Sequence, residues 1–280
     1  MRTMKILADS ACDFAKRAPA LTCVPMKITA GDAVFSDHAE LDMDILKKAL
    51  DGCRGKMGTS CPTITDWLDA FADADDIICV TVTGGLAGSS NSACAAKNCY
   101  ESEHKGKRVF VIDTLSAGPE MDLLLEKMAQ WAEKGFSYEE ICTSARSYLE
   151  QTGLLFMLKS LKNLTRSGKV SPAVATLARV AGLSIVGKAD EEGKLKPLCK
   201  CRGEARALEA LTERLEAEGG GYGRVRIAHC ENEAAALQIK KAILAKHESA
   251  SVEVYALGGI CSFYAEKGGI MIGFEKTEIG

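Results

Sequence analysis

The sequence lacks long hydrophobic runs and any concentration of charge of one sign. Near its start, Lys5 and Asp9 interrupt the apolar residues, and the other apolar stretches are no longer than a strand. Such runs are too short for a signal-peptide core or a membrane span, so we expect a cytoplasmic protein. Lysine and arginine are spread along a chain with a net charge of −3, so nucleic acid is not an expected partner.

Signatures of common enzyme classes are absent as well. The chain has no G-x-S-x-G elbow, no H-E-x-x-H pattern and no glycine-rich loop closed by Gly-Lys-Ser or Gly-Lys-Thr. Its histidines are isolated from one another in sequence: His38, His104, His229 and His247. We therefore predict no catalytic residue, no metal site and no cofactor.

Cysteine is plentiful, with 12 residues, yet the composition does not fit a disulfide scaffold. Apolar residues make up 47% of the chain, enough for a core that needs no disulfide framework. Cys199 and Cys201 form the one tight pair, and no second pair stands at zinc-ligand spacing. Most cysteines are expected to be reduced core residues, with a metal or redox role as the alternative for Cys199 and Cys201.

The first half of the chain alternates strand-like and helix-like segments. Runs rich in β-formers predict strands at residues 4–8, 21–29, 76–83 and 108–113. Apolar residues at helical spacing predict helices at residues 42–50, 63–74, 92–100 and 120–134. This alternation predicts right-handed crossovers and a mostly parallel sheet.

The pattern changes near residue 150. A hairpin is predicted from residues 184–189 and 194–201, and further strands at 154–158, 224–230, 252–257 and 269–274. Helices are predicted at 203–218 and 231–247, with a glycine-rich connector at 218–223. We therefore predict two α/β domains: residues 1–150 with a mostly parallel sheet, and residues 151–280 with a mixed or antiparallel sheet.

The segment GTSCPT at residues 58–63 is the first candidate ligand loop. Thr59 and Ser60 precede Pro62 and a predicted helix, so one interpretation is that their hydroxyls cap that helix. The other interpretation is an anion site, because a helix N-terminus offers N–H donors to a carboxylate or phosphate.

Two further loops combine glycine with polar side chains. Residues 83–92 (TGGLAGSSNS) follow a buried strand, at the sheet edge where parallel folds bind ligands. A tight turn without a ligand is the alternative. Residues 161–171 (LKNLTRSGKVS) place Arg166 and Lys169 around Gly168, either as a solvated turn or as an anion contact through Arg166.

The order of these loops resembles that of the DegV family, which includes the fatty-acid-binding subunits of bacterial fatty-acid kinases. KILADSACD at residues 5–13 is similar to the family's opening strand and D-S-x-x-D turn, and GTSCPT to its T-S-x-P loop. Further family motifs are matched in order by residues 83–93, 111–116, 161–170, 201–208 and 257–274. The resemblance covers nearly the whole chain.

The resemblance implies a long-chain fatty acid held non-covalently between the two domains. It implies a carboxylate site near the T-S-x-P and Gly/Ser loops, formed by Thr59, Ser60, Thr83, Gly84, Ser89 and Tyr264. Arg166 and Arg202 are expected contacts for an anion or a partner. The implied partner is the catalytic subunit of a fatty-acid kinase, which would phosphorylate the carboxylate with ATP. A transient encounter with a membrane is also expected.

Several positions depart from the family's motifs. Thr83 and Gly84 stand where the family has two serines, and Tyr264 stands at a histidine position. Ser167 and Lys169 replace a glycine and an arginine. A phenol donates one hydrogen bond but does not become a cation near neutral pH, as histidine does. Head-group recognition is therefore where we expect this chain to differ most from the family.

Two other functions stay open from the sequence. A lipid hydrolase or acyltransferase would use Ser60 or Ser89 as its nucleophile, which requires a base within hydrogen-bond reach. A sensor or interaction module would keep the lipid only as part of its structure. We favour a binding protein, because the chain has no nucleotide loop with which to perform the kinase step alone.

Overall fold

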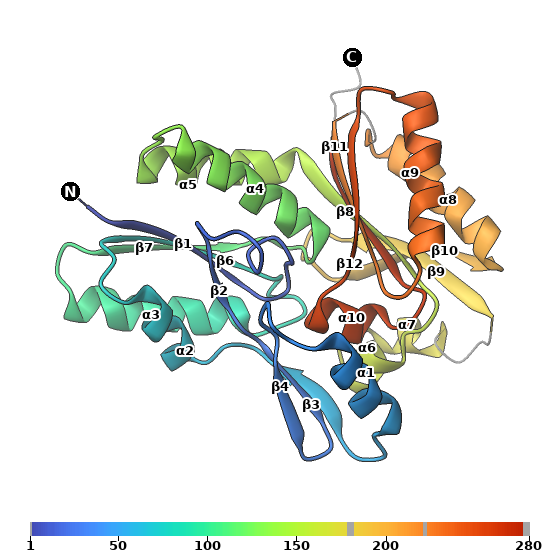
Figure 1. Cartoon of the computed structure of the whole chain (residues 1–280), viewed down its shortest axis with the longest axis horizontal. Helices are drawn as coiled ribbons and strands as arrows, with labels where there is room; N and C mark the ends of the chain where they lie inside the picture. The colour runs from blue at the N-terminus through green and yellow to red at the C-terminus, as the bar shows by residue number, and fades with distance from the viewer. Residues whose placement is uncertain (1, 178–181, 221–222, 277–280) are drawn as a thin grey trace.

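The structure, a computed structural model, describes residues 2–177, 182–220 and 223–276. Sheet A comes from the first half and is parallel, with the strand order β2-β1-β6-β7. Its strands are β1 (Met4–Asp9), β2 (Thr22–Val24), β6 (Asp76–Thr81) and β7 (Arg108–Asp113). Helices cover both faces (Figure 1): α2 (Ile64–Phe71) and α3 (Ser89–Glu103) on one, α4 (Pro119–Glu133) and α5 (Tyr138–Glu150) on the other.

Alternation of side chains along the strands explains these two helix layers. Leu7 and Ile77 pack in the cluster with α2 and α3, whereas Ile6 and Ile78 pack in the cluster with α4. Because both faces of the sheet are covered, its central strands carry consecutive apolar residues, at positions 6–8 and 77–80.

Sheet C comes from the second half and is mixed, with the strand order β10-β9-β8-β13-β11-β12. In it β11 and β12 are parallel, and the other described pairs are antiparallel. Its strands are β8 (Thr152–Leu158), β9 (Leu183–Ala189), β10 (Leu195–Arg202), β11 (Arg224–His229), β12 (Ser251–Ala256) and β13 (Ile270–Glu275). The helices α8 (Glu204–Ala217) and α9 (Glu233–Lys246) pack on its outer face (Figure 1).

Helix α4 joins the two halves, because it packs on the core of sheet A and also contacts sheet C. Three of its carboxylates are buried and bond to the second half. Glu120 accepts a hydrogen bond from Thr152 at 2.7 Å, and Asp122 accepts one from Tyr255. Glu126 pairs with Arg226 at 2.8 Å. Buried carboxylates require such partners, so these contacts fix sheet C against the first half.

A small antiparallel sheet B lies beside the first half: β3 (Lys27–Ala30), β4 (Ala33–Ser36) and β5 (Met57–Ser60), in the order β4-β3-β5. The neighbouring helices are α1 (Met43–Gly52), α6 (Lys162–Arg166), α7 (Pro172–Leu177) and α10 (Gly259–Ala265) (Figure 1). The N-terminus of α10 is anchored in the first half, because the Gly259 and Ile260 N–H groups donate to Asp37 at 3.1 and 3.0 Å. Lys16 neutralises Asp37 at 3.0 Å.

The structure confirms the predicted α/β class, with a parallel first sheet and a mixed second sheet. Some local predictions were wrong. Residues 21–29 form two strands in two different sheets, because the chain turns at Pro25. Residues 57–60 form β5 rather than a loop, and α5 was not predicted. The predicted connector at 218–223 lies partly outside the described residues.

In the described part of the chain, no helix has the length and apolar character to cross a membrane.

Candidate functional site: an apolar cavity between sheets A and C

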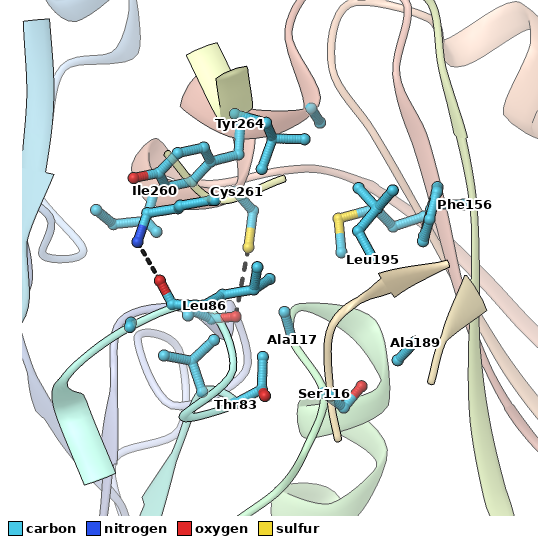
Figure 2. Close-up of a pocket in the computed structure, with 18 of the residues that line it drawn as sticks. Thr83, Leu86, Ser116, Ala117, Phe156, Ala189, Leu195, Ile260, Cys261 and Tyr264 are labelled. Carbon is cyan, nitrogen blue, oxygen red and sulfur yellow. Dashed lines mark hydrogen bonds between the residues drawn. The ribbon is translucent and has the colours of Figure 1, made fainter. Parts of the chain in front are cut away.

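An apolar cavity lies between the carboxyl edge of sheet A and the inner face of sheet C (Figure 2). The space between its walls, including solvent at its open mouth, is about 820 Å³. Its walls come from the loops after β6 and β7, from β8 and β13, from the β9–β10 hairpin and from α10. Most lining side chains are apolar, among them Leu86, Leu154, Phe156, Leu195, Ile260 and Met271.

Three polar side chains meet on the side of the cavity formed by β5, α10 and the segment after α6. Thr59 Oγ1 and Tyr264 OH lie 2.6 Å apart and share a hydrogen bond. Lys169 Nζ donates to the Leu86 carbonyl oxygen and lies 5.4 Å from the centre of the Tyr264 ring. Figure 2 shows Tyr264 and Leu86 on this side of the cavity, with Phe156 and Leu195 across from them. A few polar groups at one end of an apolar cavity orient an amphipathic ligand.

Burial changes the acid–base properties of this polar end. It raises the pKa of Tyr264, so the phenol keeps its proton and is available as a donor. It lowers the pKa of Lys169. An anion bound beside Lys169 would oppose that effect, because opposite charges favour each other's ionised form. The Ser167 hydroxyl is buried near Tyr264, and both it and Thr59 oppose the rise in the pKa of the phenol.

The Gly/Ser loop at residues 83–92 is held in place by two carboxylates. Asp9 accepts hydrogen bonds from the Val82 N–H at 2.8 Å and from Ser89 Oγ at 2.5 Å. Burial raises the pKa of Asp9 to about 6. Asp113 accepts from the Gly84 N–H at 3.0 Å, and a Cβ at Gly84 would lie 2.6 Å from Asp113 Oδ2. A side chain at position 84 would therefore have to displace the Asp113 carboxylate.

Comparison with known proteins identifies the family to which the chain belongs. Residues 3–277 match the DegV family of uncharacterised proteins. The protein belongs to the DegV family. A DegV domain-containing protein of Streptococcus pneumoniae strain R6 is 38% identical over 278 residues, which cover 98% of this chain and 99% of the relative.

Two solved structures are similar to this DegV protein over almost the whole chain. One is the fatty acid kinase B3 protein of Streptococcus pneumoniae, loaded with linoleic acid. It is 37% identical, with a TM-score of 0.94, over 98% of this chain and 100% of that chain. The other is a DegV family protein of Eubacterium eligens, loaded with heptadecanoic acid. It is 41% identical, with a TM-score of 0.92 and the same two coverages.

The residues expected at the carboxylate fall into two groups in this DegV protein. Thr59, Thr83 and Tyr264 line the cavity. The other three lie outside its lining: Ser60 is exposed at the end of β5, Gly84 faces Asp113, and Ser89 is buried with its hydroxyl donated to Asp9. The last two shape the loop that forms the wall.

The capping interpretation of Thr59 and Ser60 is wrong. The residue that caps α2 is Thr63, whose Oγ1 accepts from the Asp66 N–H at 3.1 Å. Asp66 in turn accepts from the Thr63 N–H at 2.8 Å, which completes a capping box. Thr59 lies on β5 instead, where the pairing of β5 with β3 directs it to Tyr264.

Lys169 is the cavity residue that sequence reasoning did not select. Arg166 was the expected anion contact, but it is exposed and does not line the cavity, and Arg202 is exposed as well. The signal for Lys169 was its position, where the family's motif has arginine. In the described part of the chain, no group of three or more His, Cys, Asp or Glu side chains is placed to hold a metal ion.

Proposed function

We propose that this DegV protein binds a long-chain fatty acid non-covalently in the cavity between sheets A and C, and presents its carboxylate to a separate kinase. The observation that carries this proposal is an apolar cavity whose polar end joins Thr59, Tyr264 and Lys169. Its support from relatives is that two solved structures, 37% and 41% identical, hold linoleic and heptadecanoic acid.

The acyl chain supplies most of the binding energy. A sixteen-carbon chain buries roughly fourteen methylenes at about 0.8 kcal/mol each, or about 11 kcal/mol before costs. Association and ordering offset much of this gain. The polar end therefore decides the orientation of the ligand more than its affinity.

The carboxylate is proposed to lie at the polar end, within reach of the Thr59 and Tyr264 hydroxyls. The Lys169 ammonium would exchange the Leu86 carbonyl for the carboxylate, which is the stronger acceptor because it is charged. Thr83 lines the cavity from the Gly/Ser loop and is proposed as a further contact for the carboxylate.

A separate kinase would phosphorylate the exposed carboxylate with ATP. This step is assigned to a partner because the chain has no glycine-rich nucleotide loop. The exposed Arg166 and Arg202 are proposed as contacts for that partner or for the phosphate. We propose that the reaction takes place in the cytoplasm. The boundary between the two domains is proposed to lie near residue 150, and the ligand between the domains.

The test is native mass spectrometry of the purified protein, followed by denaturation and lipid identification. We expect one fatty acid per chain, released on unfolding. In the variant Ala87→Phe the ring would fill the cavity, and the lipid should be lost. Ala234→Phe changes an exposed alanine on α9 and should keep it. A folded, empty wild-type protein, or equal occupancy in both variants, would contradict the proposal.

The hydrolase alternative gains no support from the geometry. Ser89 donates its hydroxyl to Asp9 and does not line the cavity, and Ser60 is exposed outside it. A serine-directed phosphonate should therefore leave both residues unlabelled. Adding a fatty-acid kinase and ATP distinguishes the sensor alternative from the proposed function. The proposed function predicts that the bound lipid is converted to an acyl phosphate, whereas the sensor alternative predicts that it stays unchanged.

A further inference from the structure

Cys199 and Cys201 are two residues apart on β10, so their side chains project from the same face of sheet C. Their Sγ atoms lie 3.8 Å apart, in direct contact. Cys201 is buried in the cluster that includes α8, whereas Cys199 is half-buried. Two thiols in contact, with one reachable from solvent, satisfy the first requirement of thiol–disulfide chemistry.

We propose that Cys199 and Cys201 are an oxidisable thiol pair, which hydrogen peroxide closes to a disulfide and a thiol reductant reopens. The Cys199 thiolate attacks one peroxide oxygen, the O–O bond breaks, and the leaving hydroxide takes a proton to become water. The Cys201 sulfur then attacks the sulfenic sulfur of Cys199, the S–OH bond breaks, and a second water leaves with the Cys201 proton. The two thiols lose two electrons and the peroxide gains them.

The position of β10 in the sheet permits this closure. Alternate Cα atoms of a strand are roughly 6.6 Å apart, near the upper limit for a disulfide, so the strand must pucker. β10 is the outermost strand of the described sheet and pairs only with β9. A register shift between Pro197 and Cys199 already interrupts that pairing beside the two thiols. Strained disulfides are the more easily reduced ones, which suits a reversible pair.

The surroundings of other cysteines make them poorer candidates. Cys12, Cys79 and Cys261 are buried, and burial raises the pKa of their thiols, as it also raises that of Cys201; unlike Cys201, none of the three is described in contact with a second, half-buried thiol. Cys94 and Cys99 are exposed on α3 and serve as internal controls for general oxidation. Accessibility alone predicts reaction at Cys94 and Cys99, whereas the paired geometry predicts a disulfide at Cys199 and Cys201.

The proposed disulfide has a consequence for the cavity, because the same hairpin forms one of its walls. Ala189, Lys194 and Leu195 line the cavity. At the turn, Gly193 has a φ of 71°, and a Cβ there would lie 2.0 Å from Thr83 Oγ1, so the turn fits closely against the first half. Puckering of β10 is expected to loosen this fit and to release bound fatty acid several-fold faster. This consequence rests on the proposed function, whereas the disulfide itself does not.

The experiment treats the reduced full-length protein with hydrogen peroxide and blocks remaining thiols before trypsin digestion. Trypsin cuts after Lys200, between the two cysteines. We expect residues 195–200 to be recovered linked to residues 201–202, with a loss of about 2 Da for the two hydrogens removed. Dithiothreitol should restore the separate peptides.

Two variants distinguish disulfide formation by Cys199 and Cys201 from general oxidation of accessible cysteines. Cys201→Ser should stop the reaction at a sulfenic acid on Cys199, which dimedone traps, and Cys94→Ser should still form the linked peptide. Wild-type protein in which Cys94 or Cys99 is oxidised while residues 195–200 stay unlinked would overturn the proposal. A linked peptide with unchanged lipid release would overturn only the effect on the cavity. A protein empty in both redox states would count against the proposed function and leave the disulfide standing.

Discussion

Tyr264 is the residue at which the proposed head-group site departs most clearly from the family's motif. The family's motif has a histidine at this position, and the phenol here instead shares a 2.6 Å hydrogen bond with Thr59. Burial raises the pKa of Tyr264, so in the proposed site the phenol is a neutral donor and Lys169 would supply the charge. The proposed site thus combines neutral donors with one amine.

Tyr264→Phe removes the phenol hydroxyl and keeps the ring. Hydrogen bonds to charged groups contribute about 1.5 kcal/mol or more, so we expect the Kd for a fatty acid to rise about tenfold. The affinity for the methyl ester, which carries no charge, should fall less. Tyr138→Phe changes a tyrosine outside the cavity lining and should leave both affinities unchanged. Isothermal titration with the acid and the ester measures the difference, and an equal loss for both ligands would argue against a carboxylate contact.

Asp122 makes stability depend on pH. Burial and the nearby Asp13 carboxylate raise its pKa, so the folded protein holds this proton more tightly than the unfolded chain does. The contribution of Asp122 to the free energy of unfolding should therefore fall as the pH rises above the ordinary carboxyl pKa of roughly 4, by at most about 1.4 kcal/mol per pH unit. Asp9, with a pKa raised to about 6, adds a similar decline between its ordinary pKa and pH 6.

Asp122→Asn should flatten this decline. The amide oxygen can still accept from the Asp13 and Phe14 N–H groups, and its NH₂ can donate to Tyr255, so the fold is kept. Urea unfolding between pH 4 and pH 7 measures the slope, with Asp51→Asn, which removes an exposed carboxyl, as the matched control. A slope in Asp122→Asn identical to that of the wild type would show that Asp122 does not titrate in this range.

The placement of the β9–β10 hairpin depends on one residue of its turn, Gly193. Its turn is closed by the Gly193 N–H, which donates to the Asp190 carbonyl at 2.9 Å. Gly193 adopts a positive φ, and Thr83 and Leu115 leave no room for a side chain beside it. The hairpin itself is local and was predicted from sequence, but its contact with the Gly/Ser loop joins residues far apart in the chain.

Gly193→Ala should cost more stability than Gly106→Ala. Both glycines have a positive φ, which costs an L-residue about 1–2 kcal/mol, but Gly106 has open space around it. Alanine at 193 must also displace the turn from Thr83, so we expect a larger loss and faster release of bound fatty acid. Chemical denaturation and stopped-flow release measure both effects. Equal losses in the two variants would mean that the turn does not depend on this close contact.

At the scale of the whole molecule, the buried contacts of α4 and α10 join the two halves. Helix α4 belongs to the first half and bonds to β8, β11 and β12 through Glu120, Glu126 and Asp122. Helix α10 belongs to the second half and packs in the core of the first. Separating the halves would break these buried hydrogen bonds and expose the apolar surface around them, which is costly.

We therefore expect the two halves to unfold in one transition. Both tryptophans, Trp67 and Trp131, lie in the first half, so their fluorescence reports on that half alone. Far-ultraviolet circular dichroism reports on both. The two signals should give the same midpoint in urea. A fluorescence midpoint that differs from the dichroism midpoint would show that the halves unfold separately.

Much of the fold was predictable because its signals are local. The apolar run of β6, the helical spacing of α8 and the turn between β9 and β10 are set by neighbours in sequence. α5 also carries a local signal that was not used: Ser137 and Glu140 form a capping box at its start. The choice of Tyr264 likewise came from sequence, through the family's motif, and the structure places it on the cavity.

Tertiary structure decided the rest. Residues 21–29 read as one strand, but pairing with β1 and with β5 divides them between two sheets. Ser89 was expected to contact the ligand, yet its hydroxyl donates a hydrogen bond to Asp9 of the opening strand. Sequence alone thus determined the elements and the family, because their signals lie within short windows or ordered motifs. Which side chains face the cavity was decided only when distant segments packed together, because an apolar residue at core spacing has the same local pattern in a cavity wall as in a filled core.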